Sequence, residues 1–168
     1  MTSVPLRPPA HRVSRTAVWL WAVQGVMFSA FFIAVVVVAS VVLPDDAPSG
    51  VSVPLAVLRW LLVPLTVIGV VVEPLWRYRV HRWEVTEEAV YTLEGWLSRT
   101  WRIVPVSRIQ TVDTTAGPLQ QLLGLASISV RTASHAGSTS IQQLAAPVAE
   151  SVAHDLARRA DAVRDEAT

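Results

Sequence analysis

Residues 17–43 read AVWLWAVQGVMFSAFFIAVVVVASVVL, and this uncharged run decides the fold class. A membrane-spanning helix needs about 20 apolar residues to cross roughly 30 Å of hydrocarbon, so the run is long enough to span with some tilt. A cleaved signal peptide is the competing interpretation, since arginines precede the run, but the apolar core of a signal peptide has only about 7 to 15 residues. The length therefore favours a permanent transmembrane helix.

A second apolar stretch begins at Val51 and is interrupted by Arg59. If the span is counted from Leu58 to Trp76, Arg59 and Trp60 lie at one interface and Trp76 at the other. The rise of 1.5 Å per residue then places about 24 Å between the two tryptophans. Tryptophans and snorkelling arginines are typical of membrane interfaces. The predicted interfacial anchors are Trp19, Trp21, Arg59, Trp60 and Trp76.

The two stretches predict a transmembrane hairpin over residues 17–76, with helices at about 17–43 and 58–76. Pro64 lies inside the second helix, where it should remove one backbone hydrogen bond and cause a modest kink. The connection between the helices carries Asp45 and Asp46, whereas arginines precede the first span and follow the second. By the positive-inside bias, both termini should be cytoplasmic, with residues 1–16 forming a cytoplasmic arm.

Composition limits what the remainder of the chain can do. Of the 168 residues 52% are hydrophobic and 16% are charged, the net charge is +1, and cysteine is absent. A disulfide framework and a thiolate metal site are therefore excluded. The four histidines lack zinc-site spacing, and the sequence contains neither a G-x-S-x-G motif nor a glycine-rich phosphate loop. We expect no catalytic residue, no metal and no cofactor, and nothing global suggests a nucleic-acid partner.

From residue 77 onward the pattern changes to short alternating runs separated by turns, which is typical of an antiparallel sheet. In RTWRIVPV, Trp101 and Ile103 fall on one side and Arg102 on the other. Pro118 and Gly124 bracket one short helical turn. After Pro147, apolar residues recur at helical spacing, which predicts one amphipathic C-terminal helix. The soluble domain is thus predicted over residues 77–163, with a frayed tail at 164–168.

The residues of this half resemble the bacterial pleckstrin-homology-like (PH-like) membrane proteins of the YdbS type. The features that match lie between residues 78 and 134. They are Tyr78 before the first strand, the Glu94-Gly95 turn, residues 103–110 ending in IQ, the PLQQLLGL turn at 118–125 and the SVRT strand at 129–132. The resemblance implies an α+β PH-like domain, a strongly bent antiparallel β-sandwich or partial barrel with a C-terminal helix, preceded by a helical hairpin. It brings no catalytic residues.

The best candidate site is a group of arginines near the predicted membrane surface, since each basic residue near an anionic leaflet contributes about 1 kcal/mol of binding. Their alternative role is only to fix the topology of the chain. The group consists of Arg77, Arg79 and Arg82, joined in space by Arg99 and Arg102.

The sequence thus predicts a non-enzymatic, membrane-anchored PH-like binding or scaffolding protein whose ligand is a protein segment or an anionic lipid. The alternative is a structural subunit of a larger membrane complex. The expected partners are membrane lipids and a protein partner or a second copy of the chain. The expected location is the bacterial plasma membrane, as a multi-pass protein with both termini in the cytoplasm.

Overall fold

The computed structural model describes residues 7–43, 48–95, 98–133 and 137–166. The chain folds as two compact units. The first, called here the hairpin unit, is Trp19–Leu75, and the second, called the sheet unit, combines Met1–Val18 with Trp76–Thr168.

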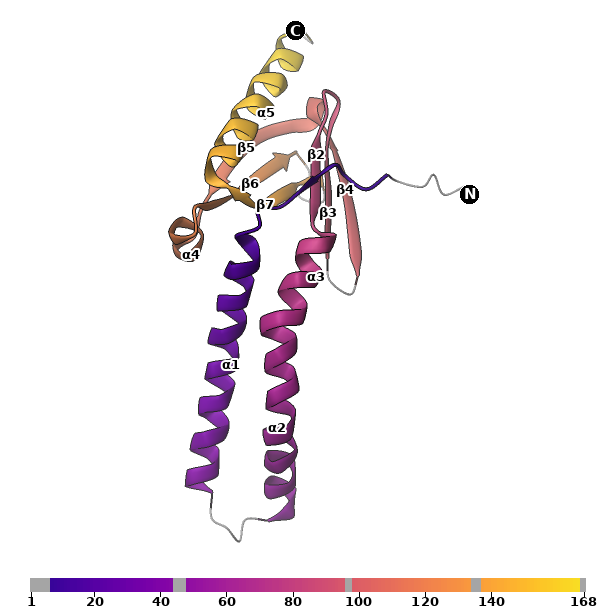
Figure 1. The fold of residues 1–168 in the computed structure, drawn as a ribbon. Coiled ribbons are helices and arrows are strands. Elements are labelled where there is room, and N and C mark those ends of the chain that lie inside the picture. Colours follow the sequence, from indigo (N-terminus) through magenta and orange to yellow (C-terminus); the bar gives the residue numbers. More distant parts are fainter. Residues whose placement is uncertain (1–6, 44–47, 96–97, 134–136, 167–168) are drawn as a thin grey trace, which may run out of the picture. The chain divides into compact units, whose positions relative to one another are not determined.

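Two long apolar helices form the hairpin unit and run side by side (Figure 1). Helix α1 is Ala17–Val42, and the second helix is continuous over Ser49–Val80. Both are long and apolar enough to cross a membrane. The second helix begins nine residues before the predicted Leu58 and continues past the predicted end at Trp76. The prediction took its bounds from the thickness of a bilayer, whereas the helical hydrogen bonds extend through the apolar residues outside that thickness.

The second helix contains one irregular turn. It consists of α2, Ser49–Val67, a π-helical turn, Ile68–Val72, and α3, Glu73–Val80. Pro74 has no N–H, and its ring crowds the carbonyl four residues earlier. The Glu73 N–H donates to the Ile68 carbonyl, five residues back, so the wider turn directly precedes Pro74. The helix continues through Pro64, where the sequence predicted a kink, and the irregularity follows that residue.

The two helices come close together at Gly25, which lies against the backbone of Gly69. A Cβ atom added to Gly25 would collide with the backbone carbonyl of Gly69 on the second helix. A Cβ atom added to Gly69 itself would meet nothing within 4 Å. Small residues at such contacts let helix backbones come together in membranes. Gly25 is therefore the residue that permits the close packing of the hairpin.

The sheet unit holds two antiparallel sheets, with strand orders β1-β2-β3-β4 and β5-β6-β7, followed by a C-terminal helix. This confirms the predicted α+β fold class. The elements are β1 His11–Arg12, β2 Arg82–Val85, β3 Ala89–Gly95, β4 Arg99–Pro105, a 3-10 turn at Val106–Arg108, β5 Ile109–Thr115, α4 Pro118–Leu122, β6 Leu125–Thr132, β7 Thr139–Ala145 and α5 Ala146–Glu166.

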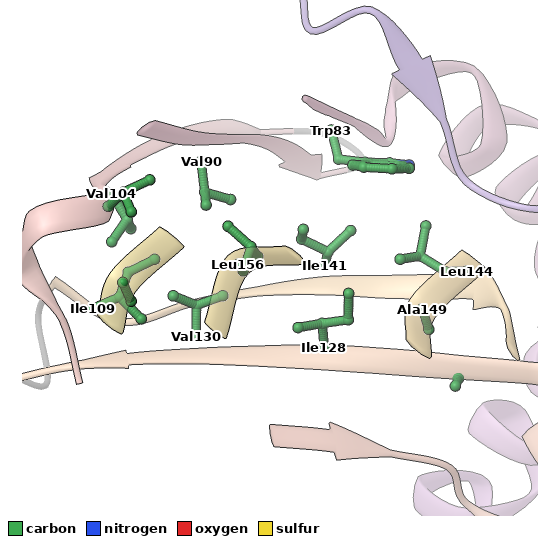
Figure 2. Close-up of a cluster of buried hydrophobic side chains, with 13 residues drawn as sticks. Trp83, Val90, Val104, Ile109, Ile128, Val130, Ile141, Leu144, Ala149 and Leu156 are labelled. Carbon is green, nitrogen blue, oxygen red and sulfur yellow. The ribbon is translucent and has the colours of Figure 1, made fainter. Parts of the chain in front are cut away.

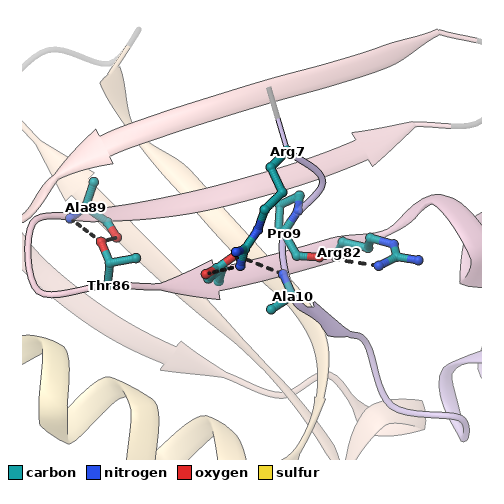
Figure 3. Close-up of polar contacts among 7 residues, drawn as sticks. Arg7, Pro9, Ala10, Arg82, Thr86 and Ala89 are labelled. Atoms are coloured by element: carbon teal, nitrogen blue, oxygen red, sulfur yellow. Dashed lines mark hydrogen bonds and ion pairs between the residues drawn. The ribbon is translucent and has the colours of Figure 1, made fainter. Parts of the chain in front are cut away.

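The residues predicted as a separate arm add an edge strand to the first sheet. His11 pairs with Trp83 and Arg12 with Arg82, so β1 extends β2. Glu84 holds the segment before β1, because its carboxylate accepts from Arg7 at 3.0 Å and from the Ala10 N–H at 2.9 Å (Figure 3). The described part of the arm thus belongs to the sheet unit. The sequence pattern did not predict these hydrogen bonds.

The core lies between the two sheets and α5. Val90 and Val104 from the first sheet, Ile128 and Ile141 from the second, and Leu156 from α5 meet there (Figure 2). Thr92 and Thr139 link the sheets through a buried hydroxyl contact of 2.9 Å. Helix α5 runs to Glu166, so the helical backbone includes residues 164–166, which were predicted to fray.

Candidate functional site

A large hollow of the sheet unit lies where the first sheet passes into the second. Its volume is about 960 Å³. The end of β4 contributes Ile103 and Pro105, the 3-10 turn Arg108, the start of β5 Gln110, and the end of β6 Thr132. We name this hollow the β4–β5 hollow. Among the described residues its lining is mainly apolar, with one charged side chain at Arg108.

The β4–β5 hollow lies between two strand edges. Strand β4 is the last strand of the first sheet, and β5 is the first strand of the second. An edge strand presents backbone N–H and C=O groups that a further strand can pair with. Ile103, on β4, is 47% exposed although it is a large aliphatic residue. The site therefore combines an open backbone edge with an exposed apolar side chain.

The path from β4 to β5 is basic. Residues 99–112 contain Arg99, Arg102 and Arg108 and no acidic residue. All three arginines are exposed. Arg108 is not among the site residues predicted from the sequence, because it lies far along the chain from the juxtamembrane arginines. The acid-free run itself was the signal that could have found it.

Arg102 lies on the core side of β4, which differs from the usual placement of a charged residue. It pairs with Thr92 and lies on the same face of the strand as buried Val104, two residues later. Its Cβ therefore points toward the second sheet. The guanidinium reaches the rim, where Nη1 donates to the Ser138 carbonyl at 3.1 Å. The predicted alternation of Trp101 and Ile103 against Arg102 is confirmed, but the side with Arg102 is the core side and Ile103 is exposed to solvent.

The acidic residue Glu94 lies close to two arginines of the predicted group. Burial raises the pKa of the Glu94 carboxyl, while the positive charges of Arg102 and Arg77 act in the opposite direction. An acidic group thus lies within the field of two of the five predicted arginines. Because a carboxylate there repels phosphate, the arrangement weakens an anion site built on Arg77 and Arg102 together.

The other members of the predicted group do not gather at one point. Arg82 lies on β2 and donates from Nη1 to the Pro9 carbonyl at 3.4 Å, toward the N-terminal segment (Figure 3). Arg79 is exposed on α3, and Arg99 is exposed at the start of β4. The strand register sets Arg82 opposite Leu93 and Arg99 opposite Gly95, so the two arginines fall in different rows of the sheet. The five arginines therefore form a dispersed basic surface.

Three of the four tryptophans predicted as interfacial anchors are exposed, which fits that role. They are Trp19, Trp60 and Trp76. Trp21 is only 4% exposed. Two residues along a helix correspond to a rotation of about 200°, so Trp19 and Trp21 point to opposite faces and cannot both meet lipid. Arg59, the remaining predicted anchor, is exposed and donates from Nε to the Ser40 hydroxyl at 3.0 Å.

The described residues include no group of three or more metal-binding side chains. Among the described residues, the lining of the β4–β5 hollow contains Ser107 and Thr132 but no histidine or carboxylate that could activate a hydroxyl. The arrangement can hold an extended segment by backbone pairing, apolar contact and charge.

Comparison with known proteins identifies the family. The family model for the bacterial PH domain matches residues 17–160. The transmembrane protein YdbS of Bacillus subtilis (strain 168), described as UPF0699, is 30% identical to this chain over 126 residues, which cover 74% of this chain and 77% of that protein. No solved structure matches the chain. The match includes the apolar helices as well as the sheets and most of α5, and the chain therefore belongs to the bacterial PH domain family, with its PH-like domain in a YdbS-type transmembrane protein.

Proposed function

We propose that this chain is a non-enzymatic, membrane-anchored binding protein whose sheet unit binds an extended, acidic protein segment along β4 and in the β4–β5 hollow. The observation that carries the proposal is the coincidence of three features at one place. These are an edge strand, a hollow of about 960 Å³ and an acid-free basic run. Each supplies a different part of peptide recognition.

The edge strand supplies the backbone part of the binding. A peptide that adds a strand to a sheet gains affinity from main-chain hydrogen bonds and specificity from pockets for alternate side chains. Strand β4 runs over Arg99–Pro105 and pairs with β3 along its whole length on one side. Its other side is the last edge of the sheet among the described strands. A segment of about seven residues would match its length.

The hollow and the arginines supply the side-chain part. An apolar side chain of the bound segment would contact Ile103 and Pro105 inside the hollow. An acidic side chain would pair with Arg108 or Arg99, which are exposed. Arginine binds carboxylates in a planar, bidentate geometry, which adds direction as well as energy.

The lipid version of the function has less support from the geometry. An acidic side chain beside this arginine group would weaken its binding of lipid phosphate, and Glu94 lies in the field of Arg77 and Arg102. The Arg82 guanidinium faces the Pro9 carbonyl instead. Arg77, Arg79 and Arg82 are therefore assigned to fixing the topology of the chain, with both termini in the cytoplasm and two crossings of the plasma membrane.

Photo-cross-linking in living cells tests the proposal on the full chain. A photoreactive phenylalanine analogue replaces Ile103 in one variant and Val148 in the control. Val148 is a suitable control because it has a similar exposed fraction but lies on α5. We expect a protein adduct from position 103 that is absent from position 148.

The charge reversal Arg108→Glu separates specific binding from collision. We expect this substitution to reduce the adduct formed at position 103, because it places a carboxylate beside the acidic segment. The matched control is Arg158→Glu on α5, which should leave the adduct unchanged. Adducts with lipid alone, or equal adducts at positions 103 and 148, would contradict the proposal. An adduct unaffected by Arg108→Glu would remove its electrostatic part.

A further inference from the structure

The hairpin unit places a polar group at the same level on both of its helices. On α1, Ser40 lies 21 residues after Trp19, which corresponds to about 31 Å along a helix. On the second helix, Arg59 lies 17 residues before Trp76, or about 25 Å. These lengths are close to the roughly 30 Å thickness of a bilayer's hydrocarbon core. With the tryptophans at one interface, Ser40 and Arg59 lie at the opposite one, at the end where the two helices connect.

Ser40 and Arg59 contact each other across the two helices. The Arg59 Nε donates to the Ser40 Oγ at 3.0 Å, and the Ser40 hydroxyl donates to the Val36 carbonyl at 2.6 Å. This chain of two hydrogen bonds fixes the guanidinium on the α1 side of α2. It leaves the two Nη groups of Arg59 without a hydrogen bond or ion pair to any residue that the structure describes.

A groove extends from Arg59 toward the middle of the hairpin. Its volume is about 560 Å³, and apolar side chains of both helices line it, among them Val37 on α1 and Val63 on α2. Thr66, about 10 Å along the helix from Arg59, lies near its far end. The groove therefore has a cationic end at the interface and an apolar body at the depth of acyl chains.

We propose that this groove binds one anionic phospholipid. The phosphate pairs with the two Nη groups of Arg59, and one acyl chain lies in the groove along Val37 and Val63. The charge complementarity is direct, because a guanidinium presents two parallel N–H donors that match two phosphate oxygens. The depth of Arg59 in the bilayer supports the same ligand, since lipid phosphates lie next to the hydrocarbon boundary.

The proposal gives Arg59 a ligand beyond its role as an interfacial anchor. A snorkelling arginine needs only water or any headgroup. Here Ser40 orients the guanidinium, and an apolar groove of defined size starts beside it. The site lies within the hairpin unit and does not depend on what the sheet unit binds.

Native mass spectrometry of the full-length chain in a mild detergent tests the proposal. The delipidated protein is titrated with dioleoyl phosphatidylglycerol or with dioleoyl phosphatidylcholine. We expect the wild type to retain one molecule of phosphatidylglycerol in preference to phosphatidylcholine. Arg59→Gln should lower the apparent affinity for phosphatidylglycerol roughly tenfold, because the charge-assisted hydrogen bonds are lost.

Two further variants make the result specific. Arg79→Gln removes an equal charge from exposed α3 and should leave the retained lipid unchanged. Thr66→Phe fills the groove without altering any charge and should lower lipid retention. This second variant tests the proposal even if Arg59→Gln fails to fold. Equal retention of the two lipids by the wild type, or equal losses in Arg59→Gln and Arg79→Gln, would overturn the proposal. So would a second protein chain, retained by the wild type and lost in Thr66→Phe.

Discussion

The two units of the chain use their apolar residues in opposite ways. In the sheet unit, large apolar side chains such as Ile128 and Leu156 converge in a buried core. In the hairpin unit, Phe28 and Val41 point outward, and no residue of α2 is buried. Burial of apolar surface from water stabilises the first unit. The second is solvated by lipid, so close packing at glycine and polar contacts such as that of Arg59 with Ser40 hold its helices together.

The largest effect is expected in the core of the sheet unit. Leu156 on α5 is 0% exposed, and Leu156→Ala removes a side chain of the buried core that α5 shares with the sheets. We expect a loss of about 2–5 kcal/mol in the free energy of unfolding, from lost burial and the resulting cavity. Faster hydrogen exchange of β6 amides in the full-length protein would report this loss.

The matched control uses the same substitution at a different place. Leu122→Ala on α4 alters a side chain that is 82% exposed, so its effect should be within about 0.5 kcal/mol. Similar exchange rates for the two variants would mean that Leu156 does not contribute to the core. Both variants should leave the packing of the hairpin helices unchanged, because that unit is stabilised by contacts between its own helices and not by the core around Leu156.

In the hairpin unit a single added methyl group should have a large effect. Gly25→Ala places a Cβ against the Gly69 carbonyl, so one helix must move. The expected loss is about 1–3 kcal/mol of packing energy, as for other overpacked sites. Because the chain has no native cysteine, a short bifunctional thiol cross-linker between Ser40→Cys and Arg59→Cys can report the approach of the helices.

Gly69→Ala provides the control for this pair, since a Cβ at Gly69 meets no atom within 4 Å. The yield of the cross-link should fall for Gly25→Ala and remain near the parent value for Gly69→Ala. Equal yields in the two variants would show that the close approach at Gly25 does not hold the helices together.

A buried hydrogen bond between the two sheets gives the next test. Thr92 and Thr139 are both buried, and their hydroxyl oxygens lie 2.9 Å apart. Thr92→Val removes one hydroxyl and leaves the other without its partner, which should cost about 1–3 kcal/mol. The double variant Thr92→Val, Thr139→Val removes both groups and should recover most of this loss. Additive effects in unfolding experiments would argue against a coupled pair.

Sequence periodicity predicted most elements of both units because each repeats a local pattern. Alternation predicted the strands after residue 77, and Pro118 with Gly124 predicted the short α4, which the structure confirms over Pro118–Leu122. The positive φ of Gly124, +63°, is the conformation that glycine favours after a helix. In such segments the local pattern and the tertiary structure agree.

What the sequence did not predict depends on contacts between distant residues. The pairing of His11 with Trp83 joins residues 72 positions apart, and nothing in residues 1–16 alternates strongly enough to indicate a strand. The hollow beside Arg108 arises from the turn between two sheets, and the sequence alone does not state how far those sheets open. The positions of Arg82 and Arg99 in different rows of the sheet likewise follow from strand register, which the sequence does not state.

The smallest expected effect concerns the first residue after α3. His81 is 5% exposed and lies within 2.9 Å of the Arg77 carbonyl through Nδ1. Burial lowers the pKa of His81 below its ordinary value of 6.5; the hydrogen bond with the Arg77 carbonyl acts in the opposite direction, and the positive charge of Arg77 adds to the lowering. The folded state therefore binds fewer protons than the unfolded state. Stability from this group is complete above pH 6.5 and is lost as the pH falls from 6.5 through the lowered pKa.

The variant His81→Asn keeps a short polar side chain that can donate to the Arg77 carbonyl, but it does not titrate. We expect its free energy of unfolding to vary less between pH 8 and pH 5.5 than that of the wild type. Each unit by which folding lowers the pKa corresponds to about 1.4 kcal/mol in the free energy of unfolding. Glu94→Gln is the control, because burial raises the pKa of that carboxyl and its contribution has the opposite sign, with stability lost as the pH rises. If His81→Asn and the wild type had parallel pH profiles, protonation of His81 would not be linked to folding of the sheet unit.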